Sequence, residues 1–158
     1  MHATPDLSLR DAIAPVVVAI LFIAGASLFK EPKRRAFMAI VVAGAGSAYL
    51  RGGFGVWEFL FAGVITVCAY RGLHSYRLIG VGWVLHTLWD VLHHLYGNAI
   101  VPFLPTSSAG CAVCDLVIAV WCFAGAPSAG ELLTGVLAAT ASAARPEART
   151  QSGSVPPA

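Results

Sequence analysis

The sequence predicts an all-α polytopic membrane protein, a bundle of five transmembrane helices with its N-terminus outside and its C-terminus in the cytoplasm. Three observations predict this fold. The 158-residue chain is 58% hydrophobic and only 11% charged, whereas soluble domains carry about 25% charged residues. Its apolar residues form blocks near the length that spans a bilayer, and its basic residues gather in alternate loops. This composition excludes a soluble enzyme, a disordered protein and a disulfide-stapled secreted module.

Five apolar blocks define the expected spans. A spanning helix needs about 20 apolar residues, and backbone groups in lipid must be satisfied within the segment, so each block is expected to be helical. The blocks cover residues 11–29, 36–50, 56–70, 78–97 and 111–126. Blocks two, three and five are short, and we expect their helices to borrow flanking residues. Glycine pairs in two of the blocks would allow close helix approach, namely Gly44 with Gly46 and Gly80 with Gly82.

The basic residues predict the orientation. Eight of the 10 Lys and Arg residues fall on one side of the predicted bundle: Lys30, Lys33, Arg34, Arg35, Arg71, Arg77, Arg145 and Arg149. Only Arg10 and Arg51 fall on the other side. Because cytoplasmic loops are enriched in Lys and Arg, we expect a multi-pass protein of the cell inner (plasma) membrane. The net charge of +2 is too small to predict a nucleic-acid partner, so the expected partner is the lipid bilayer.

The two ends of the chain differ from the apolar core. The run Ala24-Gly25-Ala26 imitates a signal-peptidase site, but the positive cluster follows the apolar block, which is the reverse of signal-peptide order. We therefore expect a retained first span. The predicted organisation is an N-terminal segment (1–10), a five-helix transmembrane domain (11–126), a short C-terminal helix (127–144) and a disordered tail (145–158). Ser128 and Glu131 predict a capping box at the start of that short helix.

The fourth predicted span carries ionisable side chains on one face. Such a group costs about 2.5 to 3.5 kcal/mol inside a membrane on insertion scales, so it indicates function by default. At 100° per residue, His86, Asp90 and His93 fall within an arc of about 60°, and His94 extends its edge. Chance seldom produces this one-sided clustering.

Three other spans bring polar residues to a similar depth. The predicted topology puts Glu58 two residues into the third span, Asp115 near the start of the fifth, and Arg51 at the end of the second. All three lie toward the outer side. We therefore expect them to meet the histidines in one polar pocket that opens outward.

The pocket has a metal interpretation. Imidazole and carboxylate groups on adjacent helical turns suit zinc or iron, and a further carboxylate from Glu58 or Asp115 would complete the shell or orient a histidine. The expected ligands are His86, Asp90, His93 and His94. A membrane di-iron oxygenase is disfavoured, because such enzymes use about eight histidines and the chain has 5.

Two further interpretations need no metal. In one, Glu58, Asp90 and Asp115 are catalytic carboxyl groups that exchange protons with imidazole, and tryptophans line an apolar cavity for a lipid or isoprenoid. In the other, pairs such as Asp90 with His94 or Asp115 with His93 only hold helices together, at about 0.6 kcal/mol per contact. The Cys111-x-x-Cys114 motif has three possible roles: the cysteines could form a disulfide, supply two more metal ligands, or serve only in helix packing.

The run Trp83-Val84-Leu85-His86-Thr87-Leu88-Trp89-Asp90-Val91-Leu92-His93-His94 is continued by Val101-Pro102-Phe103 and by residues 111–115. Together they resemble an uncharacterised family of small bacterial integral-membrane proteins, a domain of unknown function with an H-x-x-x-D-x-x-H-H fourth helix. The resemblance extends from the first span through the fifth. It implies a membrane protein with a polar fourth helix and implies no particular activity.

The functional expectation is a small integral-membrane protein with a buried His/Asp/Glu site in the outer half of the bilayer. The leading hypothesis is a metal-assisted or acid/base enzyme acting on a lipid-like or isoprenoid substrate. The alternatives are an ion- or proton-coupled transporter and a structural membrane partner protein without catalysis. Residues 64–69 and 119–126 carry no charge, which argues moderately against a proton path to the cytoplasm.

Overall fold

The computed structural model describes residues 7–50 and 53–143, which form helices and connections with no strand among them. The six helices are α1 (Leu9–Ala26), α2 (Lys33–Ala45), α3 (Val56–Gly72), α4 (Tyr76–Tyr96), α5 (Ser107–Phe123) and α6 (Ala129–Ala143). The chain divides into two compact units, one ending at Ala126 and one beginning at Pro127. The all-α prediction is confirmed.

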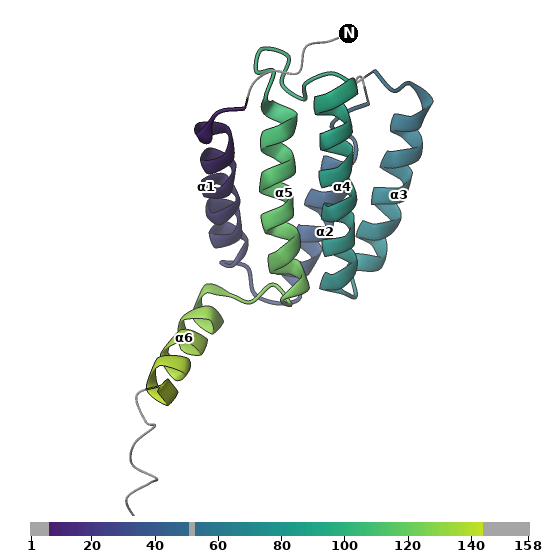
Figure 1. The fold of residues 1–158 in the computed structure, drawn as a ribbon. Coiled ribbons are helices and arrows are strands. Elements are labelled where there is room, and N and C mark those ends of the chain that lie inside the picture. Colours follow the sequence, from purple (N-terminus) through teal and green to yellow (C-terminus); the bar gives the residue numbers. More distant parts are fainter. Residues whose placement is uncertain (1–6, 51–52, 144–158) are drawn as a thin grey trace, which may run out of the picture. The chain divides into compact units, whose positions relative to one another are not determined.

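The first unit is a bundle built from α1 to α5. The connections α1–α2 and α3–α4 lie at one end, and α2–α3 and α4–α5 lie at the other (Figure 1). The most extensive contact joins α4 to α5, followed by α1 with α5, α3 with α4 and α2 with α3. The α4–α5 contact is therefore the centre of the bundle. Side chains that α4 and α5 turn toward each other, such as Asp90 and Asp115, are shielded from solvent.

Local sequence signals explain where two of the helices begin. At the start of α1 the Ser8 N–H donates to the Asp11 carboxylate at 2.9 Å. Before α6 the Ser128 N–H donates to Glu131 Oε2 at 2.6 Å, and the Glu131 N–H donates to Ser128 Oγ at 3.2 Å. Each contact satisfies a backbone group that a helix start leaves without an intrahelical partner. The predicted capping box is present.

Small residues set the distance between helices. An added Cβ at Gly82 would lie 3.1 Å from Val42 of α2, and one at Gly80 would lie 3.1 Å from the Phe123 ring of α5. Both glycines therefore allow α4 to approach its neighbours closely, as expected from the sequence. Gly46 does the same beside Ile65 of α3, whereas Gly44 has open space around its α-carbon.

The predicted spans differ in how well their helices could cross a bilayer. Within the described ranges, α1 is the one helix that is both long and apolar enough to do so. Helix α5 is apolar but has 17 residues, and α2 has 13 residues and begins with three basic side chains. Both helices are therefore shorter than the roughly 20 residues that a span needs, since a helix rises only about 1.5 Å per residue. The five-span arrangement and its orientation stay predictions.

A polar contact ties the α1–α2 connection to the start of α4. Arg34 is buried, and its Nε donates to Glu31 Oε1 at 3.0 Å and to the Tyr76 hydroxyl oxygen at 3.2 Å. The Tyr76 hydroxyl in turn donates to Glu31. Burial, more than the hydrogen bond to Glu31, raises the pKa of Tyr76 to about 12, so its hydroxyl keeps its proton at neutral pH. This contact fixes the end of the bundle that carries most of the basic residues.

The substitution Tyr76→Phe removes that hydroxyl and leaves Arg34 and Glu31 with one hydrogen bond fewer each. We expect the free energy of unfolding to fall by about 1 kcal/mol, measured by thermal unfolding of the purified protein. Tyr70→Phe is the matched control, because Tyr70 is exposed. Equal melting temperatures for the two variants would contradict a structural role for the Tyr76 contact.

Candidate functional site

One face of α4 turns three ionisable side chains into the bundle. His86, Asp90 and His93 have exposed fractions of 2%, 0% and 1%. They are spaced at i, i+4 and i+7, which places them on one side of a helix with 3.6 residues per turn. His94 follows His93 by 100° and is only half-buried. The candidate site therefore centres on the first three residues.

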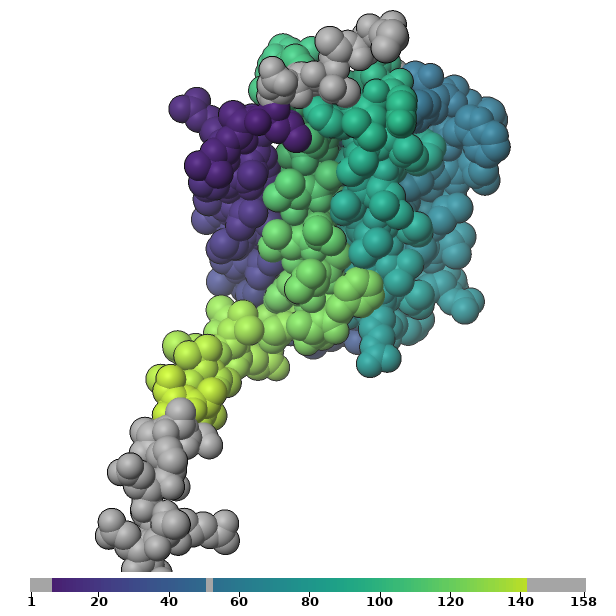
Figure 2. Space-filling view, in the orientation of Figure 1, coloured from purple at the N-terminus to yellow at the C-terminus, as the bar shows by residue number. Residues whose placement is uncertain are grey.

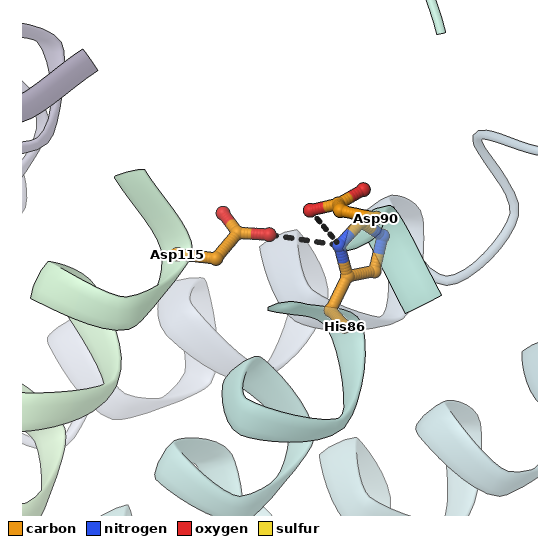
Figure 3. A group of neighbouring side chains, drawn as sticks. All are labelled: His86, Asp90 and Asp115. Atoms are coloured by element: carbon orange, nitrogen blue, oxygen red, sulfur yellow. Dashed lines mark hydrogen bonds and ion pairs between the residues drawn. The ribbon is translucent and has the colours of Figure 1, made fainter. Parts of the chain in front are cut away.

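His86 joins two carboxylates from different helices. Its Nδ1 lies 2.8 Å from Asp115 Oδ2 on α5 and 3.2 Å from Asp90 Oδ2 on α4 (Figure 3). Asp115 is also buried. We call these three residues the histidine–aspartate cluster. One donor atom from each lies within 4.8 Å of the others, which is close enough for all three to bind a single metal ion.

The other ring nitrogen of His86 fixes its tautomer. Nε2 lies 2.8 Å from the carbonyl oxygen of Ala45. A carbonyl can only accept a hydrogen bond, so Nε2 carries a hydrogen and donates it. Ala45 is the last residue of α2, and its carbonyl also accepts a hydrogen bond from the Ala48 N–H at 2.9 Å in the turn that follows. Nδ1 is thereby left to face the two carboxylates.

Tyr49 orients the second carboxylate oxygen of Asp90. Its hydroxyl donates to Asp90 Oδ1 at 2.6 Å, and the side chain is buried. The sequence analysis did not single out Tyr49 or the Ala45 carbonyl. A usable signal existed for Tyr49, because a tyrosine near the predicted outer end of the second span lies at the same depth as Asp90.

A second buried pair consists of Glu58 and His93. Glu58 Oε1 lies 3.2 Å from His93 Nε2, although neither nitrogen of His93 forms a well-aligned hydrogen bond among the described residues. Glu58 instead accepts hydrogen bonds from the Phe54 N–H at 3.2 Å and from Trp89 Nε1 at 3.1 Å. The His93 ring stacks on Tyr49 with centroids 3.9 Å apart. Tyr49 therefore touches both the pair and the cluster.

The remaining sequence candidates lie elsewhere. Arg51 is outside the described residues. His94 contributes to neither the cluster nor the pair, and within the described part of the chain its Nδ1 has no hydrogen-bond partner. Cys111 and Cys114 are both free thiols, so they form no disulfide. The pairings expected for simple helix adhesion, Asp90 with His94 and Asp115 with His93, differ from the observed contacts of His86 with both aspartates.

The charge of the cluster is not balanced by a basic side chain. In the described part of the chain, the ion pairs of Asp90 and Asp115 involve His86 and no Lys or Arg. Two ionised carboxylates beside one imidazole leave at least one uncompensated negative charge, and burying such a charge costs several kcal/mol. Extra protons or a bound cation must therefore accompany the cluster.

These observations define an all-helical protein with a buried histidine–aspartate cluster between its α2, α4 and α5 helices. The chain belongs to a family of unknown function (DUF6010), which matches residues 10–128. The match includes both aspartates, His86 and the Glu58–His93 pair. No curated protein and no solved structure matches the chain. The resemblance to a family without an assigned activity is confirmed, and the bacterial and membrane character it implied stays a prediction.

The substitution Tyr49→Phe tests the support of Asp90. It leaves a buried carboxylate oxygen without its donor, and such a loss costs about 1 to 3 kcal/mol. We expect a matching drop in the free energy of unfolding, followed by thermal denaturation. Tyr96→Phe, at an exposed position of the same bundle, should change little. If Tyr49→Phe left the free energy of unfolding unchanged, the hydrogen bond from Tyr49 to Asp90 would contribute nothing to the stability of the site.

Proposed function

We propose that this chain is a small multi-pass membrane protein whose histidine–aspartate cluster binds a divalent metal ion, zinc or iron, and uses it on a lipid-like or isoprenoid substrate. The observation that carries the proposal is the convergence of three buried donor groups within 4.8 Å. The donors come from two helices, so the α4–α5 packing holds them in place. Imidazole and carboxylate donors suit both metals.

Charge balance favours a cation at this position. With Nε2 bound to the Ala45 carbonyl, a deprotonated Nδ1 and two ionised aspartates present a total charge of −2. One divalent ion neutralises that charge. The Nδ1–Oδ2 separations of 2.8 and 3.2 Å are hydrogen-bond distances, and a small side-chain movement would widen them to the spacing of about 3.3 Å between neighbouring ligands of a tetrahedral zinc site.

The contacts behind the ligands also support metal binding. Metal-binding histidines usually donate their other ring N–H to a carbonyl or carboxylate, which fixes the tautomer and the ring orientation. His86 does so through Ala45, and Tyr49 holds the outer oxygen of Asp90. In this proposal His86, Asp90 and Asp115 are the ligands, whereas His93 and His94 are not.

A metal with three protein ligands keeps a position for water or substrate. In such a site the ion polarises a bound oxygen and lowers the pKa of a bound water. The Glu58–His93 pair is a further acid–base group beside the cluster, because Tyr49 contacts both His93 and Asp90. We assign Glu58 as the candidate proton acceptor.

A specific contact favours a second candidate function, acid–base catalysis without metal. His86 Nδ1 is at hydrogen-bond distance from both aspartates, so a proton can occupy the position that we assign to the ion. A carboxylic acid and an imidazole that share a proton form a general acid–base pair. Metal analysis separates the two candidates.

The surface of the first unit supports the membrane setting. Large apolar side chains are exposed on several of its helices, whereas soluble monomers rarely expose apolar patches of more than a few hundred Å². Examples are Val18, Leu21, Phe59, Leu60, Val67, Leu88 and Val120. The α1–α2 and α3–α4 connections share one end of the unit (Figure 1). Most of the described basic residues lie in these connections or in the helix turns beside them, as the positive-inside rule expects.

Metal content tests the cluster directly. We expect the protein, purified in detergent without added chelator, to hold about one zinc or iron per chain by elemental mass spectrometry. Asp115→Asn and His86→Gln should lower that content at least about tenfold, because each removes a ligand.

Glu58→Gln is the matched control for the metal experiment. It also replaces a buried carboxylate by its amide, but outside the cluster, so its metal content should match that of the wild type. Metal-free wild type that binds neither zinc nor iron on titration would leave the acid–base candidate as the function of the site. Equal metal loss in Glu58→Gln would indicate general unfolding instead of ligand removal.

Cysteine labelling tests the proposed topology. In a chain whose four cysteines are replaced by alanine, Phe103→Cys in the α4–α5 connection should react with an impermeant maleimide in intact cells. His74→Cys in the α3–α4 connection should react only after permeabilisation, because the two loops would lie on opposite sides. Labelling of both from outside would overturn the five-span arrangement, and the reverse pattern would invert the orientation.

A further inference from the structure

A cavity of about 430 Å³ lies between α1 and α5. Its size is within the range of about 300–1,000 Å³ that is usual for ligand pockets. The apolar wall is formed by α1 and by the α4–α5 connection, through Ala14, Pro15, Val18, Ile100, Val101 and Leu104. Helices α1 and α5 border one another on the face seen in Figure 2.

The dimensions of the cavity fit one chain. Its lining on α1 extends from Arg10 to Val18, which is about 12 Å of helix. A cavity of this size and length has room for one acyl chain.

The mouth of the cavity has a basic side chain available for a ligand. Arg10 is exposed, and no carboxylate in residues 7–50 or 53–143 pairs with it. The neighbouring Asp11 is already engaged, because it accepts hydrogen bonds from the Ser8 N–H at 2.9 Å and from the Thr106 hydroxyl at 2.8 Å. One guanidinium matches one carboxylate in a bidentate pair, and the adjacent Asp11 charge disfavours a doubly charged phosphate.

We infer that this cavity binds a single-chain amphiphile with a carboxylate head group, a long-chain fatty acid, with the head at Arg10 and the chain between α1 and α5. The inference deepens the proposed function by naming its substrate class, and it rests on that function for the reaction. Cys111 and Cys114 line the inner wall. Cys111 is four residues before Asp115, on the same face of α5. A bound chain would therefore pass beside the helix that supplies a cluster ligand.

Binding is measured with the full-length protein in lipid nanodiscs, by displacement of a fluorescent fatty-acid analogue with myristate. We expect Arg10→Gln to weaken myristate binding about tenfold, because a charge-assisted bidentate contact is lost. Ala14→Phe should reduce binding at least as much, because the new ring occupies the cavity. The corresponding fatty alcohol should bind wild type and Arg10→Gln equally.

Two matched variants keep the test specific. Ala12→Phe adds the same ring on α1 at a position that does not line the cavity, and Arg77→Gln removes a basic side chain elsewhere. Both should bind myristate as the wild type does. Unchanged binding in Ala14→Phe would overturn the proposal, as would tighter binding of lysophosphatidylcholine than of myristate.

A further variant distinguishes this proposal from the metal site. Asp115→Asn should keep myristate binding, because its side chain does not line the cavity, even though it loses the metal. Retained binding in a protein that never holds metal would overturn the metal proposal alone. Loss of binding in Ala14→Phe and Arg10→Gln, with normal metal content, would support both.

Discussion

The structure depends on the way in which two buried aspartates share one imidazole nitrogen. Asp90 and Asp115 are withdrawn from solvent and directed at His86, and no basic side chain in the described chain pairs with them. Desolvated carboxylates remain ionised only beside a compensating positive charge. Whatever supplies that charge, proton or metal, is held where α4 meets α5. The most extensive helix contact in the bundle and the most polar part of its interior therefore coincide.

Tyr49 joins the two polar groups of the interior. Its hydroxyl binds Asp90 while its ring stacks on His93, which lies beside Glu58. Aromatic rings surround His93 and exclude water from the Glu58–His93 pair. The ring centroid of Phe54, for example, lies 4.5 Å from that of His93. Hydrogen bonds strengthen when water is excluded, and unsatisfied groups become costly. The Glu58–His93 pair is thus shielded from solvent, and the His93 nitrogens are buried without a well-aligned hydrogen bond among the described residues.

Helical periodicity could predict which residues gather, but not which residues pair. The 3.6-residue repeat placed His86, Asp90 and His93 on one face, and the alternation of loops put Asp115 and Glu58 at the same depth. The pairing depends on the order of helices around the bundle and on their axial register, which periodicity does not encode. His94 is only one residue from His93, yet a rotation of 100° separates it from the Glu58–His93 pair. The hydrogen bond between His86 and the Ala45 carbonyl depends on where α2 ends, and no side-chain pattern in the sequence predicts that position.

The early end of α2 gives the cluster its backbone acceptor. Helix α2 has 13 residues, about 20 Å, against a hydrocarbon core of about 30 Å. In the proposed membrane setting its last carbonyls would lie at a depth where non-helical backbone is tolerated only inside protein. His86 donates to the Ala45 carbonyl, which also accepts a hydrogen bond from the Ala48 N–H in the turn that follows. The residues of this turn bring Tyr49 to Asp90. The end of α2 therefore orients the cluster twice, through its last carbonyl and through Tyr49.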